Sequence, residues 1–486
     1  VQAVQKTKMA IPRRFKGKPV ILVLVLSITL FLMFKSYLGL NDNRRSGVSK
    51  LRSFFTFSVT KQNGGSSINY SIETVDTFIE LYRSKQVALG SQFILIDSEP
   101  YNEFRKRLRS DKKSNTLLHL QLNDNGLKTN LSGTKMGSCE KFYNGINQYE
   151  LYDPNEEDTV ANLLNELATR PIVKAESPLE YNQTTIILTN DLGCVGIFKP
   201  KKFSREYQTP EDLLYFSEFE HHTSEIAAFH LDRIFGFNRS PPSVGRMINV
   251  TSDIKRQNNI YPYMSPVGNR CLVIFCKQYC DSACAICGEP EMLEGSLTIS
   301  LPGRQIPIVK DETIHPWRRT YTIAKAAWEL DDGYCNRHVK IDLKYKKGRI
   351  LLDLVDMAVF DFLTGNMNRQ YFDKFDEFAE DAYLLHSDNS KGFSKSHYDC
   401  MSCLAPLRQC CLIRLSTLAK LIKLYQGPDS LSHLMRTSLN SDPIAPILLE
   451  PHLDALDRRL GKVIKAVSDC VNSKSWDDVV VNDGVH

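Results

Sequence analysis

One segment, residues 350–389, restricts the possible folds of this 486-residue chain more than any other. Residues 350–363 are apolar on most sides, which predicts a fully buried helix. The polar loop 365–369 follows, and a second apolar stretch then leads to Asp388. Phosphoryl-transfer sites require this order, because the loop positions the attacking hydroxyl group and a carboxylate about twenty residues later holds a metal ion near the phosphates. The loop position that should hold a proton-accepting Asp holds Asn368.

The N-terminal segment accounts for the positive charge of the chain. Residues 1–35 contain seven bases and no acids, so the formal net charge of +5 becomes −2 for the remainder, and nothing supports a nucleic-acid partner. Residues 19–40 are long and apolar enough to span a bilayer if Lys35 snorkels to its surface. The bases before this run orient the N-terminus to the cytosol, which favours a type II signal anchor over a cleaved signal peptide. Met9 is an alternative start residue.

Sequons and cysteines beyond this run indicate a lumenal or extracellular body. Five sequons are candidate glycosylation sites: Asn69, Asn130, Asn182, Asn238 and Asn249. All thirteen cysteines follow the run, and five lie within 17 residues: Cys271, Cys276, Cys280, Cys284 and Cys287. The spacings within this cluster also suit zinc, but only three residues separate Cys280 from Cys284, which is short for a folded four-cysteine site. Disulfides are therefore the favoured interpretation in an oxidising lumen.

Beyond the anchor, the chain divides into a polar stem and a globular part. Residues 41–138 are polar and mixed, with one expected helix at 73–84, and are expected to be partly disordered. From Cys139 onward, the patterns predict strands at 184–189 and 194–198, paired around a turn, and helices at 224–235 and 451–471. Thr223 is the expected N-cap of the first of these helices, and Gly236 ends it. Strands followed by helices predict a two-lobed α+β fold.

Several charged residues near the ends of these elements are candidates for chemistry. Lys199 ends a strand in a hairpin with two glycines and could neutralise phosphates, although taken alone it fits a surface lysine better. Glu220 and Glu225 could pair with Lys199 or bind a metal, and the alternative is a solvated acidic face. Asp388 fits a metal-holding carboxylate and a turn-forming Asp equally. Asp361 lies in the buried helix, so a structural hydrogen-bonding role is favoured.

Seven segments in the same order resemble the secretory-pathway kinase family that contains the Golgi casein kinase, an extracellular serine/threonine protein kinase, and the glycosaminoglycan xylosylkinase. The resemblance extends from Cys139 to Asp478. The segments that carry it are residues 197–200, 224–233, 294–297, 315–319, 359–369, 406–411 and 450–460.

The resemblance implies an atypical two-lobed protein-kinase-like fold stapled by disulfides. The implied organisation is a cytosolic tail (1–18), a transmembrane anchor (19–40), a lumenal stem (41–138) and a kinase-like domain (139–478) with lobes at 139–300 and 301–478. ATP and Mn²⁺, or Mg²⁺, are the implied cofactors. The implied location is the Golgi membrane, or outside the cell after cleavage. Secreted proteins or proteoglycans are the implied substrates, and a copy of the chain or a family paralogue is a possible dimer partner.

The resemblance also assigns roles to individual residues. Gln183, Lys199 and Asp373 would contact the nucleotide, Glu220 would pair with Lys199 and bind metal, and Asp388 would hold metal. Thr298, Ile299, Ser300 and Leu301 would line the adenine. The implied disulfides are Cys271–Cys287, Cys276–Cys280, Cys335–Cys410 and Cys411–Cys470. Five cysteines remain without a family partner, namely Cys139, Cys194, Cys284, Cys400 and Cys403, and of these Cys400 and Cys403 can pair with each other.

The chain departs from the family pattern at its loop. Asn368 takes the position of the catalytic Asp, and an amide can orient a hydroxyl group but cannot accept its proton. Losing a general base typically costs about 10²–10⁴ in rate. Gln370 and Tyr371 replace a His-His pair, and Ser387 replaces an aliphatic residue. Glu220, in contrast, is retained here, whereas the family's pseudokinase branch lacks an acid at that position.

Two functions from different classes follow. The first is a kinase that uses Mn²⁺ and ATP to phosphorylate secreted proteins on Ser/Thr, or proteoglycan xylose. The second is a nucleotide-binding pseudokinase that activates an active paralogue. Positioning supplies most of the catalysis in phosphoryl transfer, so loss of the base weakens the first function without excluding it. The presence of Lys199, Glu220 and Asp388 favours a kinase-type assignment, whereas the sequence does not decide between protein and xylose substrates.

Overall fold

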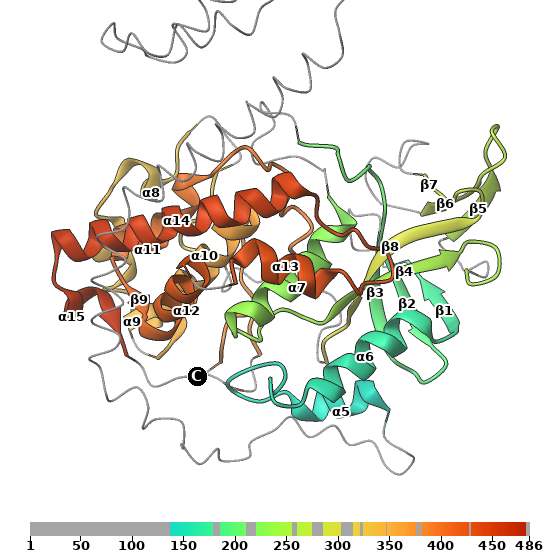
Figure 1. The fold of residues 1–486 in the computed structure, drawn as a ribbon, viewed down its shortest axis with the longest axis horizontal. Coiled ribbons are helices and arrows are strands. Elements are labelled where there is room, and N and C mark those ends of the chain that lie inside the picture. Colours follow the sequence, from blue (N-terminus) through green and yellow to red (C-terminus); the bar gives the residue numbers. More distant parts are fainter. Residues whose placement is uncertain are drawn as a thin grey trace, which may run out of the picture. The chain divides into compact units, whose positions relative to one another are not determined.

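The structure is a computed structural model, and it carries the candidate residues on a sheet and on the helices that follow it. It describes residues 137–177, 185–209, 220–254, 260–274, 285–302, 314–320, 324–346, 348–375, 378, 382–426 and 429–482. Figure 1 shows strands β1 to β8 at the right of the view and helices α10, α12 and α14 at the left.

Five antiparallel strands form the main sheet. In spatial order they are β1 (Ile172–Glu176), β2 (Ile186–Asn190), β3 (Val195–Pro200), β8 (Met292–Ile299) and β4 (Ser243–Asn249). Helices α5 (Ser138–Gly145) and α6 (Glu157–Thr169) cover it, because α6 packs on β4 and β8 and α5 packs on α6. A smaller sheet contains β5 (Ile260–Met264), β6 (Arg270–Ile274) and β7 (Ile286–Cys287).

Helices dominate the part of the chain after the sheet. The central one is α10 (Ile350–Thr364), in which almost every residue is buried, and α14 (Glu450–Ser473) packs against it. Around them lie α8 (Ala327–Leu330), α9 (Leu343–Lys346), α11 (Ala405–Cys410), α12 (Leu415–Gln426), α13 (Leu431–Leu439) and α15 (Trp476–Val479). A π-helix (Cys335–Val339), a 3₁₀ turn (Met401–Leu404) and the parallel strands β9 (Ile413–Arg414) and β10 (Val480–Val481) complete this part.

Helix α7 (His222–Phe235) links the two parts through its packing. Its Phe229 lies in the apolar core beneath the sheet, whereas Ile226 and Leu231 lie in the core formed by α10, α12 and α14. Because α7 contacts both cores, it fixes the position of the sheet relative to the helices. A residue in its first turn can therefore reach groups from both parts.

The sequence predicted most of these elements. Strands β2 and β3 pair around Gly193, which has the positive φ of 80° that favours glycine, and α10 and α14 begin and end within a few residues of the expected bounds. The predicted cap of α7 is wrong, because the helix begins at His222 and Thr223 already lies in its first turn. The anchor at 19–40 and the stem helix at 73–84 lie outside the described residues. In the part of the chain that the structure describes, no helix combines the length and apolar character needed to cross a membrane.

Disulfides join distant parts of the described chain. Three pairs match those implied by the resemblance: Cys271–Cys287, Cys335–Cys410 and Cys411–Cys470. Cys139–Cys194 and Cys400–Cys403 are two further pairs. Cys287 is therefore not available to a zinc site, whereas Cys276, Cys280 and Cys284 lie outside the described residues.

One predicted glycosylation site is inconsistent with the fold. The Asn238 side chain is buried, with 3% of the residue exposed, and its amide donates a hydrogen bond of 3.0 Å to Glu150. A glycan cannot be accommodated on this atom in the folded protein. Asn249 is partly exposed at the end of β4 and stays a candidate, and Asn69, Asn130 and Asn182 lie outside the described residues.

Candidate functional site

Strand β3 directs Lys199 away from the sheet core. Side chains alternate along a strand, so Phe198 is buried under the sheet while its neighbour Lys199 lies on the opposite face. Gly295 on the paired strand β8 is required for this arrangement, because a Cβ atom there would lie 2.3 Å from the Phe198 ring. The pattern of small and large residues in β3 and β8 thus fixes the direction of the lysine.

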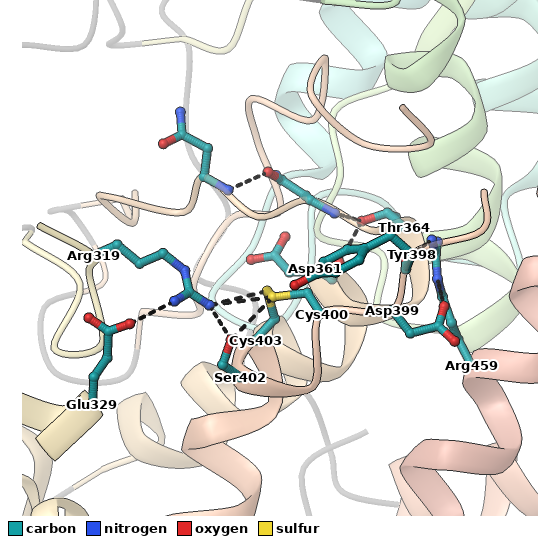
Figure 2. The surroundings of a disulfide bond; sticks show 12 residues. Arg319, Glu329, Asp361, Thr364, Tyr398, Asp399, Cys400, Ser402, Cys403 and Arg459 are labelled. Atoms are coloured by element: carbon teal, nitrogen blue, oxygen red, sulfur yellow. Dashed lines mark hydrogen bonds and ion pairs between the residues drawn. A yellow bond between two sulfur atoms is a disulfide. The ribbon is translucent and has the colours of Figure 1, made fainter. Parts of the chain in front are cut away.

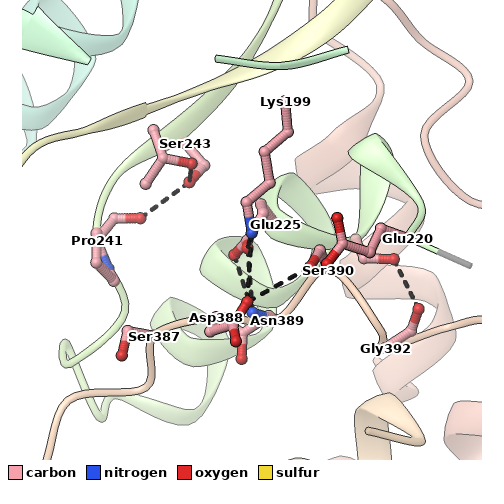
Figure 3. A network of polar contacts seen from close by, with 12 residues as sticks. Lys199, Glu220, Glu225, Pro241, Ser243, Ser387, Asp388, Asn389, Ser390 and Gly392 are labelled. Atoms are coloured by element: carbon pink, nitrogen blue, oxygen red, sulfur yellow. Dashed lines mark hydrogen bonds and ion pairs between the residues drawn. The ribbon is translucent and has the colours of Figure 1, made fainter. Parts of the chain in front are cut away.

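The Lys199 ammonium group lies between two carboxylates (Figure 3). Its Nζ is 2.7 Å from Oε1 of Glu225, in the first turn of α7, and 3.4 Å from Oδ1 of Asp388. The Lys199 and Glu225 side chains are only 15% and 7% exposed. We call Lys199, Glu225 and Asp388 the lysine site. It joins the sheet, α7 and the chain segment beyond α10.

The lysine partner differs from the one expected. The resemblance assigned this role to Glu220, but Glu220 lies 3.7 Å from Lys202 instead, and Glu225 makes the short contact with Lys199. The first turn of α7 explains the difference, since it aims Glu225 at the end of β3. Glu220 is not on a solvated acidic face either, because its side chain is only 10% exposed.

The charges of the lysine site stabilise one another. Burial acts to lower the pKa of Lys199, but the negative charges of Glu225, Asp388 and Glu220 outweigh it and the pKa is raised. Glu220 is thus close enough to act on the lysine through its charge. Protein atoms packed around Asp388 act to raise the pKa of this carboxyl group, but the positive charges of Lys199 and Arg369 outweigh them and the pKa lies below its ordinary value. Both groups therefore stay charged near neutral pH.

Asp388 is held firmly yet remains accessible. Its φ of 54° lies in the left-handed region, which Asp tolerates better than most residues. The next residue, Asn389, is buried and donates its backbone N–H to both Glu225 oxygens at 3.1 and 3.2 Å. The Asp388 side chain nevertheless remains 63% exposed. An exposed carboxylate on a fixed backbone is suited to holding a metal ion.

The loop after α10, residues 365–370, contains three amide side chains, and we call it the amide loop. It begins at Gly365, whose φ of 74° ends the helix. The Asn366 side chain accepts a hydrogen bond from the Asn368 backbone at 3.1 Å and donates to the Asp388 carbonyl at 3.5 Å. Gln370 donates to the Asn368 side-chain oxygen at 3.3 Å. The loop is therefore ordered by amides, and Asn368 can orient a hydroxyl group but cannot take its proton.

Arg369 connects the amide loop to the lysine site. Its guanidinium makes two hydrogen bonds to Asp361, at 2.9 and 2.8 Å, and one to Asn389 at 3.1 Å, and it also donates to the Ser387 carbonyl. Asp361 thus has the structural role that the sequence indicated. The paired guanidinium and carboxylate fix the loop relative to the backbone on both sides of Asp388.

The remaining predicted nucleotide contacts lie in several places. Asp373 accepts a hydrogen bond of 2.7 Å from Ser387, so it is tied to the residue before Asp388. Thr298 and Ile299 end β8, Thr298 shares a hydrogen bond of 2.7 Å with Ser243, and the Ser300 carbonyl accepts one of 2.7 Å from Tyr143. Leu301 is buried. Gln183 lies outside the described residues.

The carboxylates of the site fit a hard divalent cation only if a bound nucleotide supplies further oxygen ligands. Glu220 and Asp388 provide carboxylate oxygens, which Mn²⁺ and Mg²⁺ prefer. Within the described ranges, no cluster of three or more His, Cys, Asp or Glu residues could hold a metal ion by itself. Sites of one or two carboxylates that are completed by phosphate oxygens are typical of nucleotide-bound metals.

Sequence reasoning missed two residues of this site. Asn389 fixes Glu225 through its backbone N–H, and no role for it was predicted from the sequence. Ser387 was noted as a departure without a role, and it binds Asp373. Thr223 was predicted as the N-cap of α7, whereas Glu225 in the first turn was the better signal for the site, because the helix dipole favours an acid at that position.

The site combines a strand lysine with a helix glutamate, and an Asp some twenty residues beyond an ordered loop lies close to both. This combination defines the protein-kinase-like class of phosphotransfer folds. The model of the family "Golgi casein kinase, C-terminal, Fam20" matches residues 137–479, and the chain belongs to this family.

The relatives and solved structures agree with that assignment. The chain is 42% identical to the human extracellular serine/threonine protein kinase FAM20C over 71% of its own length and 59% of that protein, so it spans less than two thirds of this relative. It is 37% identical to the mouse pseudokinase FAM20A (78% and 74% of the two lengths) and 37% identical to the human glycosaminoglycan xylosylkinase (69% and 80%). The crystal structure of the Golgi casein kinase with Mn/ADP bound matches with a TM-score of 0.66 and 36% identity, over 71% of this chain and 84% of that one.

Proposed function

We propose that this protein binds ATP with Mn²⁺ at the lysine site and transfers the terminal phosphoryl group to a hydroxyl group of a secreted protein or of proteoglycan xylose. The observation that carries the proposal is the contact of Lys199 with both Glu225 and Asp388. A single ammonium group between a helix carboxylate and an exposed strand-end carboxylate is the arrangement that cradles nucleotide phosphates in kinase-type folds.

Each residue has a distinct part in this proposal. Lys199 neutralises phosphate charge while Glu225 holds it in place, and Asp388 with Glu220 would hold the metal ion. When bound there, a divalent ion would supply positive charge that stabilises the negative charge developing on the phosphates. Thr298 to Leu301 would line the adenine, and Gln183 and Asp373 would make further nucleotide contacts. Asn368 would orient the acceptor hydroxyl group, so that positioning and charge stabilisation supply the rate.

The setting is part of the same proposal. Residues 19–40 would anchor the chain in the Golgi membrane with its kinase-like domain, 139–478, in the lumen, or the domain would be released by cleavage. The disulfides of the described residues suit an oxidising compartment. The Mn/ADP-bound relative supports the choice of cofactor.

The amide at position 368 supports a second candidate function. A loop without a carboxylate at this position fits a pseudokinase that binds nucleotide and acts on an active paralogue. The chain is 37% identical to a protein named as a pseudokinase, and this similarity supports the second candidate function. Here the lysine site would hold nucleotide for conformational stability and the chain would transfer nothing.

A phosphotransfer assay with two acceptors separates the candidates. The purified chain is given Mn²⁺ and labelled ATP with either a Ser-x-Glu peptide or a xylose-containing acceptor. Transfer to one acceptor that disappears in Asp388→Asn establishes the kinase and its substrate class. Nucleotide binding without transfer to either acceptor favours the pseudokinase, and absence of nucleotide binding would overturn both.

A further inference from the structure

Cys400 and Cys403 form a disulfide at the 3₁₀ turn before α11, and Arg319 lies beside it (Figure 2). The two cysteines are separated by only two residues in the sequence Cys400-Met401-Ser402-Cys403. A disulfide that closes so short a loop restricts the unfolded chain far less than Cys335–Cys410 or Cys411–Cys470, which span 75 and 59 residues. Its contribution as a structural staple is therefore small, and the Cys-x-x-Cys spacing is the one used by thiol–disulfide oxidoreductases.

A guanidinium group lies directly on the two sulfurs. Nη2 of the buried Arg319 is 3.4 Å from Sγ of Cys400 and 3.9 Å from Sγ of Cys403, and Ser402 accepts a hydrogen bond of 2.6 Å from the same nitrogen. The other edge of the guanidinium is held by Glu329 at 3.0 Å. A neighbouring Arg stabilises the thiolate form of cysteine, which is both the nucleophile and the leaving group in exchange.

Acidic groups near the sulfurs do not cancel this effect. Asp399, the neighbour of Cys400, is itself paired with Arg458, Arg459 and Lys462 at 2.7 to 2.9 Å. Asp361, in the wall of the adjoining cavity, is paired with Arg369. Glu329 contacts the nitrogen of Arg319 that points away from the sulfurs. The guanidinium therefore presents positive charge to the disulfide.

The two sulfurs differ in accessibility. Cys400 is buried, with 3% of the residue exposed, whereas Cys403 is half-buried and lines a cavity of about 40 Å³. Asn366, Met367 and Arg369 of the amide loop form another wall of that cavity. Met401 and Ser402 beside Cys403 are exposed, so an incoming thiolate can reach Cys403 from solvent. The sulfur nearer to Arg319, that of Cys400, becomes the leaving group.

We propose that Cys400–Cys403 is a thiol–disulfide exchange site for a small thiol of the glutathione class, with Cys403 as the attacked sulfur and Cys400 as the thiolate held by Arg319. In the first step, the thiolate of the small thiol forms a bond to Sγ of Cys403, the Cys400–Cys403 bond breaks, and its electron pair leaves on Cys400. A second thiolate then attacks the sulfur of the bound small thiol and releases the Cys403 thiolate. Overall, two small thiols are oxidised to their disulfide and the protein disulfide is reduced to two thiols.

Redox titration of the purified full chain tests the site. The chain is equilibrated in glutathione buffers of graded ratio, free thiols are alkylated, and mass spectrometry measures each disulfide. We expect Cys400–Cys403 to be half-reduced at a reducing ratio at least about 100-fold lower than Cys335–Cys410 and Cys411–Cys470, which serve as internal references. Reduction of Cys400–Cys403 together with these references would overturn the proposal.

Variants test the role of Arg319. Arg319→Gln should shift the midpoint at least about tenfold toward more reducing buffer, and Arg319→Lys should restore most of the shift because it keeps the charge. The neighbouring, exposed Arg318→Gln is the matched control and should leave the midpoint unchanged. If Arg319→Gln fails to fold, Ser402→Ala tests the same contact by removing the hydroxyl that orients the guanidinium, and it should shift the midpoint in the same direction. An unchanged midpoint in every folded variant of this contact would overturn the proposal.

The attacked sulfur can be trapped directly. In Cys400→Ser, Cys403 has no cysteine left to pair with, so it should carry glutathione as a mixed disulfide. In Cys403→Ser, Cys400 should stay largely unmodified because it is buried. The reverse labelling pattern would contradict the assignment. Neither measurement depends on phosphotransfer, so failure here is distinct from failure of the proposed function.

Discussion

The lysine site and the amide loop lie next to each other and differ in what they retain. The lysine site combines an ammonium group with two carboxylates at 2.7 and 3.4 Å, and each is fixed by a different element. The amide loop is equally well ordered, through Arg369 and Asn366, but its side chain at the expected base position is Asn368. The groups that we propose for nucleotide binding and the position of the usual proton acceptor therefore lie on separate elements, and the chain keeps the former while Asn368 occupies the latter.

The largest expected effect comes from placing a carboxylate in the amide loop. Asn368→Asp should raise the rate of phosphotransfer about 10²–10⁴-fold, because the side chain could then accept the proton of the attacking hydroxyl group. The affinity for Mn²⁺ and ATP should stay unchanged, since the lysine site is not altered. Initial rates at saturating nucleotide measure the effect. The double variant Asn368→Asp with Asp388→Asn is the control and should transfer nothing, and an unchanged rate in the single variant would refute the assignment of Asn368.

The next effect concerns the metal-holding group of the lysine site. Loss of a residue that only contacts a metal ligand typically costs roughly 10–100-fold in metal affinity. Asp388→Asn should weaken binding of Mn²⁺ and ATP by more than this, because Asp388 would contact the metal directly. Asn tolerates the positive φ at this position, so the variant removes the charge without straining the backbone. Calorimetric titration measures the affinity, and the thermal midpoint verifies folding. Retention of full affinity would place the metal elsewhere.

A smaller effect is expected from the contact that fixes Asp373. Ser387→Ala removes the hydrogen bond of 2.7 Å between the two side chains and should weaken nucleotide binding by about 1 kcal/mol, or roughly fivefold. The rate of transfer at saturation should be unaffected. Asp373→Asn should give an effect of similar size if the pair acts as a unit, so a double variant should cost little more than either single one. Additive losses would contradict the coupling.

The smallest expected effect is that of pH on nucleotide binding. The pKa of Lys199 is raised and that of Asp388 is lowered, so both charges persist from about pH 7 to pH 9, where the terminal phosphate of ATP is also ionised, and affinity should be nearly constant across this range. Asn368 does not titrate, whereas Asn368→Asp introduces a base whose protonation stops transfer. The variant's rate at saturating nucleotide should therefore fall as the pH drops through the pKa of the new carboxyl group. A fall in the affinity of the parent chain between pH 9 and pH 7 would show that the charges of the lysine site do not persist.

Local patterns predicted the frame of this site but not all of its contacts. The apolar run that became α10, the hairpin of β2 and β3, and the placement of Lys199 and Asp388 follow from periodicity and motif order. The partner of Lys199 did not follow, because Glu220 and Glu225 are both acids near the start of α7 and only the three-dimensional path of the chain decides which one reaches β3. The same reason hid Asn389, whose contribution is its backbone N–H.

Burial was the other property that the sequence could not supply. A sequon identifies Asn238 as a possible glycan acceptor, yet packing against Glu150 buries it. Similarly, Cys139 and Cys194 are 55 residues apart and had no family partner, and only the packing of α5 on α6, which covers the sheet, brings them together. Both depend on contacts between segments that are distant in the chain.

The central claim is that the lysine site binds nucleotide through the charge of Lys199 and in a metal-dependent manner. Calorimetric titration of the purified chain with ATP, with Mn²⁺ or with a chelator, tests it most directly. We predict saturable binding at one site that requires Mn²⁺ and that is lost in Lys199→Gln. Binding should be retained in the control Lys174→Gln, because Lys174 is an exposed lysine on β1 that, among the described residues, forms an ion pair only with Glu176, at 2.7 Å. Binding that ignores the metal, or that survives in a folded Lys199→Gln variant, would contradict the account.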